Sequence, residues 1–111
     1  MIENLNSKNF REHLNSEFKV QAPDGQALSL RLTEVTERDT NPRAEQFSIF
    51  FLGPRTPLLE QRIYHLKHEK LGEFDLFVVP VGMEADGVLY ECVFNRFRKP
   101  EAMRPTDAKT S

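Results

Sequence analysis

Two histidines and a glutamate lie within five positions of each other and could do chemistry: His65, His68 and Glu69. Imidazole and carboxylate groups are competent metal ligands and acid–base groups. Residues three apart converge on a helix but point to opposite faces of a strand, and the segment Ile63–His68 is predicted to be a strand. We therefore expect one imidazole to hydrogen-bond at the sheet margin and the other to face solvent, with no metal site and no catalytic residue.

Two carboxylates, Asp75 and Glu91, form a second candidate because the strands that carry them are predicted to pair. A catalytic pair of carboxylates also needs a cleft and a defined separation. We interpret Glu91 instead as part of an exposed stripe or as an ion-pair partner of one of three arginines, namely Arg62, Arg96 or Arg98. The sequence contains no serine-hydrolase signature and no glycine-rich phosphate-binding loop.

Cys92 is the only cysteine, so it cannot form a disulfide within the chain. Its position in a dense apolar strand predicts a buried, inert thiol rather than a nucleophile. A zinc site of the usual kind would need several cysteines or histidines close together, and none is predicted. We expect no cofactor and no enzymatic activity.

Composition predicts one ordinary domain: the chain has 111 residues, of which 39% are hydrophobic and 29% are charged. We place this β-rich domain at residues 1–98 and a flexible polar tail at 99–111. A net charge of -2 and a pI near 5.9 disfavour nucleic acid as a partner, although basic residues gather around Phe97 near the end. No apolar run approaches the roughly 20 residues needed to cross a bilayer, and the polar start lacks a signal-peptide pattern, so we expect a cytoplasmic protein.

The elements that must position these residues are clearest between Phe74 and Phe97, where two dense apolar runs flank Asp86-Gly87. This pattern predicts an antiparallel hairpin. The first run is apolar on both faces, so we expect both faces to be buried and the strand to end near Pro80, which cannot donate a ladder hydrogen bond. In the return strand the core face is predicted to carry Val88, Tyr90, Cys92 and Phe94.

The rest of the chain is predicted to form one short helix and further strands. Ser7 is expected to cap a helix over Lys8–Ser16 whose apolar stripe contains Phe10 and Leu14. A solvated loop is expected from Glu37 to Glu45, and the strands are expected at residues 18–22, 28–32, 46–52 and 63–68. Together these elements predict a mainly β fold, a small antiparallel barrel or sandwich of about six strands with a short N-terminal helix.

Two stretches, LFVVPVG at residues 76–82 and YECVFNR at residues 90–96, carry a resemblance to a known family. The chain is similar to a family of small bacterial proteins known chiefly as a domain of unknown function, over most of residues 10–96. The resemblance implies an accessory or assembly role, because members are sometimes encoded near phage-tail-collar-like proteins. Cys92 stands where the resemblance leads us to expect a small residue such as alanine, which argues against a redox role.

These observations predict a non-enzymatic protein-interaction or assembly module, linked through the resemblance to phage-tail-like structures. The partner is expected to be a protein or a second copy of the chain. The expected contact residues are Phe50, on the strand at residues 47–52, and Arg96, Phe97 and Arg98, where the chain leaves the last strand. Two alternatives remain open at this point. One is a small-ligand-binding barrel whose aromatic side chains line a cavity, and the other is a metal-dependent enzyme that uses His65 and His68.

Overall fold

The computed structural model describes residues 5–38 and 44–97, and this part of the chain contains one short helix and six strands. The elements are α1 (Ser7–Arg11), β1 (Glu17–Gln21), β2 (Ala27–Arg38), β3 (Ala44–Gly53), β4 (Arg62–His68), β5 (Gly72–Glu84) and β6 (Gly87–Phe97).

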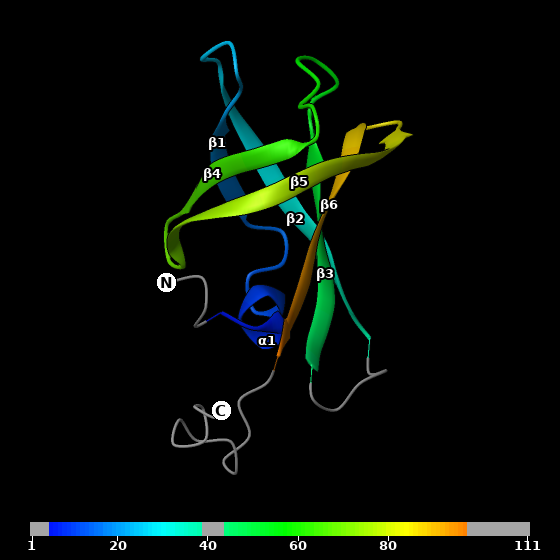
Figure 1. The fold of residues 1–111 in the computed structure, drawn as a ribbon. Coiled ribbons are helices and arrows are strands. Elements are labelled where there is room, and N and C mark those ends of the chain that lie inside the picture. Colours follow the sequence, from blue (N-terminus) through cyan, green and yellow to red (C-terminus); the bar gives the residue numbers. More distant parts are fainter. Residues whose placement is uncertain (1–4, 39–43, 98–111) are drawn as a thin grey trace.

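All strand pairs are antiparallel, and the order β1-β2-β3-β6-β5-β4 closes on itself because β1 also pairs with β4. The predicted mainly β fold with an N-terminal helix is confirmed, and the closure makes it a barrel. The two closing ladders differ in length, since β3 and β6 form ten residue pairs whereas β1 and β4 form two. Figure 1 shows α1 at one end of the barrel, opposite the β1–β2 turn, the β3–β4 connection and the β5–β6 hairpin.

Alternating side chains of each strand fill the barrel interior. On β6 the four residues predicted to face the core are all buried, as expected from the period of two. Phe10 of α1 is fully buried and brings its ring within 5.5–6.3 Å of the rings of Phe47, Phe74 and Phe94. The helix therefore supplies a side chain to the core and plugs one end of the barrel.

The outer face of β5 corrects one prediction. Phe74, Leu76 and Val78 are buried as expected, but Phe77 is 49% exposed and Val81 is 47% exposed. The prediction that both faces are buried was wrong because a closed barrel has a single interior, and nothing described in the structure packs on the outside of β5 there.

Strand β5 also runs past Pro80, where its end was predicted. The register with β6 shifts between Pro80 and Gly82, so the strand carries a bulge there and continues to Glu84. A bulge accommodates a residue that cannot donate to the ladder, which explains why the proline does not end the strand. The reversal itself is made at Ala85 and Asp86, directly before Gly87.

The helix is shorter than predicted and begins one residue earlier. Its N-cap is Asn6 rather than Ser7: the Asn6 side chain accepts a hydrogen bond from the Asn9 amide, and the Asn9 side chain accepts one from the Asn6 amide. This reciprocal pair satisfies two amides of the first turn. The helix ends at Arg11, so Leu14 falls outside it and is 40% exposed rather than part of an apolar stripe.

The predicted loop from Glu37 to Glu45 is shorter at both ends, because β2 includes Glu37 and Arg38 and β3 begins at Ala44. Pairing with β3 extends β2 into this polar segment, and pairing with β6 extends β3 into it from the other side. Residues 39–43 and the predicted tail at 99–111 lie outside the described residues. Within the described part of the chain, no helix has the length and apolar character required to pass through a membrane.

Candidate functional site

His68 lies at the end of β4 and is only 7% exposed. Its Nδ1 accepts hydrogen bonds from the backbone amides of Lys70 and Leu71, both at 3.0 Å, in the turn that follows the strand. Its Nε2 must therefore carry the proton, which it donates to Ser16 Oγ at 2.9 Å. Burial, followed by the neighbouring His13, lowers the pKa of His68 below its ordinary value, so the imidazole is held neutral.

The hydrogen bond between the Ser16 hydroxyl and the His68 imidazole runs in the opposite direction to that between a catalytic nucleophile and its base. A base must accept the hydroxyl proton, whereas here the imidazole donates to the hydroxyl and Ser16 Oγ donates in turn to the carbonyl oxygen of His13. Both ring nitrogens of His68 are thus occupied by structural hydrogen bonds. The arrangement ties the segment before β1 to the turn after β4.

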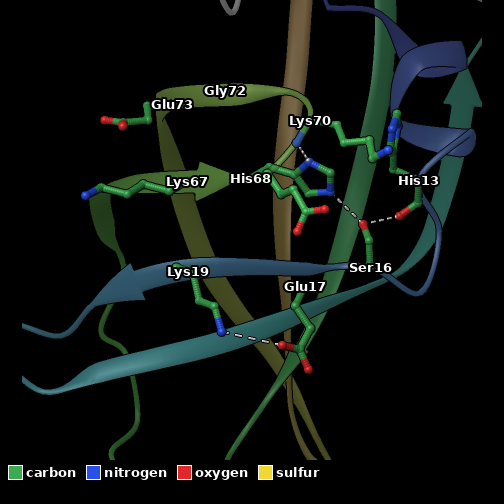
Figure 2. A pocket seen from close by; sticks show the side chains of 10 residues that line it. His13, Ser16, Glu17, Lys19, Lys67, His68, Lys70, Gly72 and Glu73 are labelled. Carbon is green, nitrogen blue, oxygen red and sulfur yellow. Dashed lines mark hydrogen bonds and ion pairs between the residues drawn. The ribbon is translucent and has the colours of Figure 1, made fainter.

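A surface groove with a volume of about 600 Å³ lies over this buried imidazole (Figure 2). Charged side chains of both signs dominate its lining, which includes Lys19, Lys67, Lys70, Glu17, Glu69 and Glu73. Because three cations face three anions, the groove offers no net charge that would select an anionic or cationic ligand. It contains none of the phenylalanine or tyrosine side chains that the ligand-binding barrel was expected to use.

His65 points away from the barrel, as expected for a residue three positions before a buried histidine on a strand. Its Nδ1 lies 2.7 Å from Asp75 Oδ1 and its Nε2 lies 2.9 Å from Glu73 Oε1. The hydrogen bonds to Glu73 and then to Asp75 raise the pKa of His65, and the bond to His65 lowers the pKa of Glu73. The side chains are half exposed or more, so solvent weakens these pairs.

The two histidines therefore lie on opposite faces of β4 and do not converge, as the strand prediction required. Among the described residues no three histidine, cysteine or acidic side chains are grouped so that they could hold a metal ion. Glu69 is exposed in the turn after β4 and lines the groove.

Asp75 and Glu91 are also apart. Glu91 pairs in register with Val79, four residues from Asp75 along β5, which corresponds to about 13 Å of strand. Glu91 Oε2 accepts a hydrogen bond from the hydroxyl of Ser48 at 2.7 Å, a contact that neither the exposed stripe nor the ion pair considered from the sequence includes. Ser48 is 1% exposed, so this contact supplies a partner for a buried hydroxyl.

Cys92 faces the barrel interior and is fully buried. Burial, reinforced by the nearby Glu91, raises the pKa of its thiol far above the ordinary value. A thiol that is neither ionised nor accessible is a poor nucleophile, in agreement with the inert role predicted for it.

The residues predicted to contact a partner are only partly described. Phe50 lies half-buried on the outer face of β3, opposite Glu34 on one side and Glu91 on the other. Arg96 and Phe97 belong to β6 and pair in register with Glu45 and Ala44. Arg98 lies outside the described residues.

Sequence reasoning missed a strip of six residues on the outside of the barrel. We call it the β4–β5 outer strip; it consists of three directly opposed pairs, Ile63 with Phe77, His65 with Asp75, and Lys67 with Glu73. Ile63 is 65% exposed and Phe77 is 49% exposed. The short turn at residues 69–71 and the alternation of the two strands contained the signal, since together they set the register that places the six residues on one face.

The sequence of residues 5–94 matches the family model described as domain of unknown function DUF6916. The chain belongs to this family. The matched part of this DUF6916 chain includes α1, β1 to β5 and most of β6, which confirms the resemblance to a family of unknown function. No curated protein and no solved structure matches the chain.

Proposed function

We propose that this DUF6916 domain is a non-enzymatic protein-interaction module that acts as an accessory in an assembly. The observation that carries the proposal is the exposed pair of Ile63 and Phe77, which stand opposite each other on neighbouring strands of the outer face. Single exposed apolar residues are common on protein surfaces, but adjacent ones form a patch that a partner can cover. Aromatic side chains of this kind are typical anchors of protein interfaces.

The chemistry of the titratable groups supports the same proposal. His68 is fixed neutral by three hydrogen bonds, His65 bridges two carboxylates in solvent, and Cys92 is enclosed in the core. The three groups thus have separate surroundings and do not share a pocket. An interaction surface needs only shape, apolar area and charge, which the β4–β5 outer strip provides.

The test is capture of partners from the native cells with the tagged full chain, followed by mass spectrometry. The resemblance to proteins encoded near phage-tail-collar-like genes makes a component of a phage-tail-like assembly the first partner to look for. We expect Phe77→Ser to lower the recovery of a stoichiometric partner at least about tenfold, since loss of an interface anchor typically removes 2 kcal/mol or more.

The matched control is Leu58→Ser, which makes an exposed apolar residue polar in the β3–β4 connection, at a position that is not part of the strip. Recovery should be unchanged in this variant. Equal recovery with Phe77→Ser and the unaltered chain, with both variants folded by circular dichroism, would contradict the proposed surface.

A further inference from the structure

The β4–β5 outer strip has an unusual distribution of charge. Its basic groups lie on β4, where Lys67 and His65 point outwards, and its carboxylates lie on β5, where Glu73 and Asp75 point outwards and contact the imidazole of His65. Lys19 of β1 stands opposite Lys67, with its ammonium group 3.5 Å from Glu17 Oε1 of the same strand. The strip is therefore basic along one edge, acidic along the other, and apolar at the end that carries Ile63 and Phe77.

We propose that the β4–β5 outer strip binds the same strip of a second copy of this chain. The two copies would be related by a two-fold axis that lies over the outer face, parallel to the strands and midway between β4 and β5. Rotation about this axis exchanges the β4 side of the strip with the β5 side and leaves the position of each residue pair along the strands unchanged. Every β4 residue of one copy then meets the β5 residue of the same pair in the other copy: Ile63 meets Phe77, His65 meets Asp75, and Lys67 meets Glu73. An interface of this kind is self-complementary, as a two-fold contact requires.

The alternatives explain the pattern less well. A partner with a uniformly acidic or basic face would meet like charges along one edge of the strip, which opposes binding. Each of the three pairs instead joins groups that attract each other. In the two-fold arrangement each residue of the strip therefore meets an attractive group of the second copy. This inference rests on the proposed function and names the partner of the same surface.

Six side chains cover less than the roughly 800 Å² per partner found in stable complexes. The dimer should therefore be weak and should depend on concentration. Sedimentation equilibrium of the purified full chain at about 1 µM to 1 mM should show a monomer–dimer equilibrium. A chain that stays monomeric over this range would overturn the inference.

Two charge reversals test the predicted orientation. In a dimer of Lys67→Glu, and equally of Glu73→Lys, like charges face each other at both symmetric copies of that pair. Each variant alone should dimerise about tenfold more weakly than the unaltered chain. A one-to-one mixture should recover the association as a heterodimer, because the two carboxylates of one variant then face the two ammonium groups of the other.

The mixture separates binding from folding. Both variants disturb the pair of residues 67 and 73 within their own barrel, and mixing does not repair that, so only contact between chains accounts for recovery. The controls are two single variants, Lys8→Glu and Glu12→Lys, which make the same charge changes at exposed positions around α1. These controls should dimerise as strongly as the unaltered chain. If Lys67→Glu and Glu73→Lys also dimerise as strongly as the unaltered chain, the inference is overturned.

The outcome also distinguishes this inference from the proposed function. If the purified chain is monomeric but Phe77→Ser abolishes capture of another protein from cells, the surface is an interaction site for that protein and the dimer is wrong. If the chain is monomeric and capture is unaffected, both the dimer and the proposed surface are wrong.

Discussion

The contrast between His65 and His68 shows how neighbouring residues of one type acquire different properties. Alternation along a strand predicts that the two imidazoles face opposite sides, and they do. Which one is buried could not be predicted, because the partners of His68 come from Ser16, far away in the sequence, and from amides of a turn. The partners of His65 lie on β5 and depend on the register of the hairpin.

The lowered pKa of His68 predicts acid sensitivity. As the pH falls through the ordinary value near 6.5, the unfolded chain binds a proton at this residue before the folded chain does. The contribution of His68 to stability is therefore present above pH 6.5 and decreases as the pH falls towards the lowered pKa. The raised pKa of His65 acts in the opposite direction, with a contribution present below about pH 6.5 and lost as the pH rises through the raised value.

The measurement is the free energy of unfolding in urea at several pH values between 5 and 7.5, in a His65→Gln background that removes the opposing effect. We expect stability to decrease as the pH is lowered from 6.5, and the decrease to become smaller when His68→Gln is added. If His68→Gln leaves the slope unchanged, His68 is not the group responsible.

At the scale of the element, the hairpin between β5 and β6 was predicted from Asp86-Gly87, and its position is correct. The bulge was not predicted, because a proline in an apolar run is compatible with a strand end, an edge or a bulge, and only pairing with β6 decides among them. Position 87 requires glycine because of a contact with another strand, which the sequence of the hairpin alone does not show. Its φ is +150°, and an added Cβ would lie 2.0 Å from the carbonyl oxygen of Gly53.

Gly87→Ala should therefore be strongly destabilising, by about 3 kcal/mol or more, because β3 and β6 would have to move apart where they pair. Gly25→Ala is the matched control: its φ of +93° is also unfavourable for alanine, but an added Cβ would meet no atom within 4 Å. Its loss should stay near 1–2 kcal/mol, the strain of the backbone alone. Urea unfolding of both variants measures the difference, and equal losses would show that the contact with Gly53 is unimportant.

At the scale of the whole molecule, the number and type of strands could be predicted, but the closure could not. Strand patterns indicate which residues alternate, whereas the pairing of β1 with β4 joins segments far apart in the sequence. Closure in turn decides exposure, which is why Phe77 and Val81 face solvent although the run is apolar on both faces. The interaction surface thus became visible only once the barrel was known.

The plug formed by α1 makes the N-terminal segment part of the core. Phe10→Ala should lower the free energy of unfolding by about 3–5 kcal/mol, since it removes a fully buried ring that contacts three other rings. Leu14→Ala, at a 40% exposed position just beyond the helix, should change it by less than about 1 kcal/mol. Thermal or urea unfolding compares the two, and similar small losses would mean that the barrel does not depend on its plug.

The unequal ladders that close the barrel have a consequence for the order in which the molecule assembles. Strands β1 to β3 and strands β4 to β6 are two meanders, each built from hairpins between consecutive strands. Ten residue pairs join the meanders between β3 and β6, but only two join them between β1 and β4. Both seams join strands that are far apart in the sequence, so the number of residue pairs decides between them: the long seam should join the halves first and the short seam should close last. The same short seam is then the place where the folded barrel opens most readily.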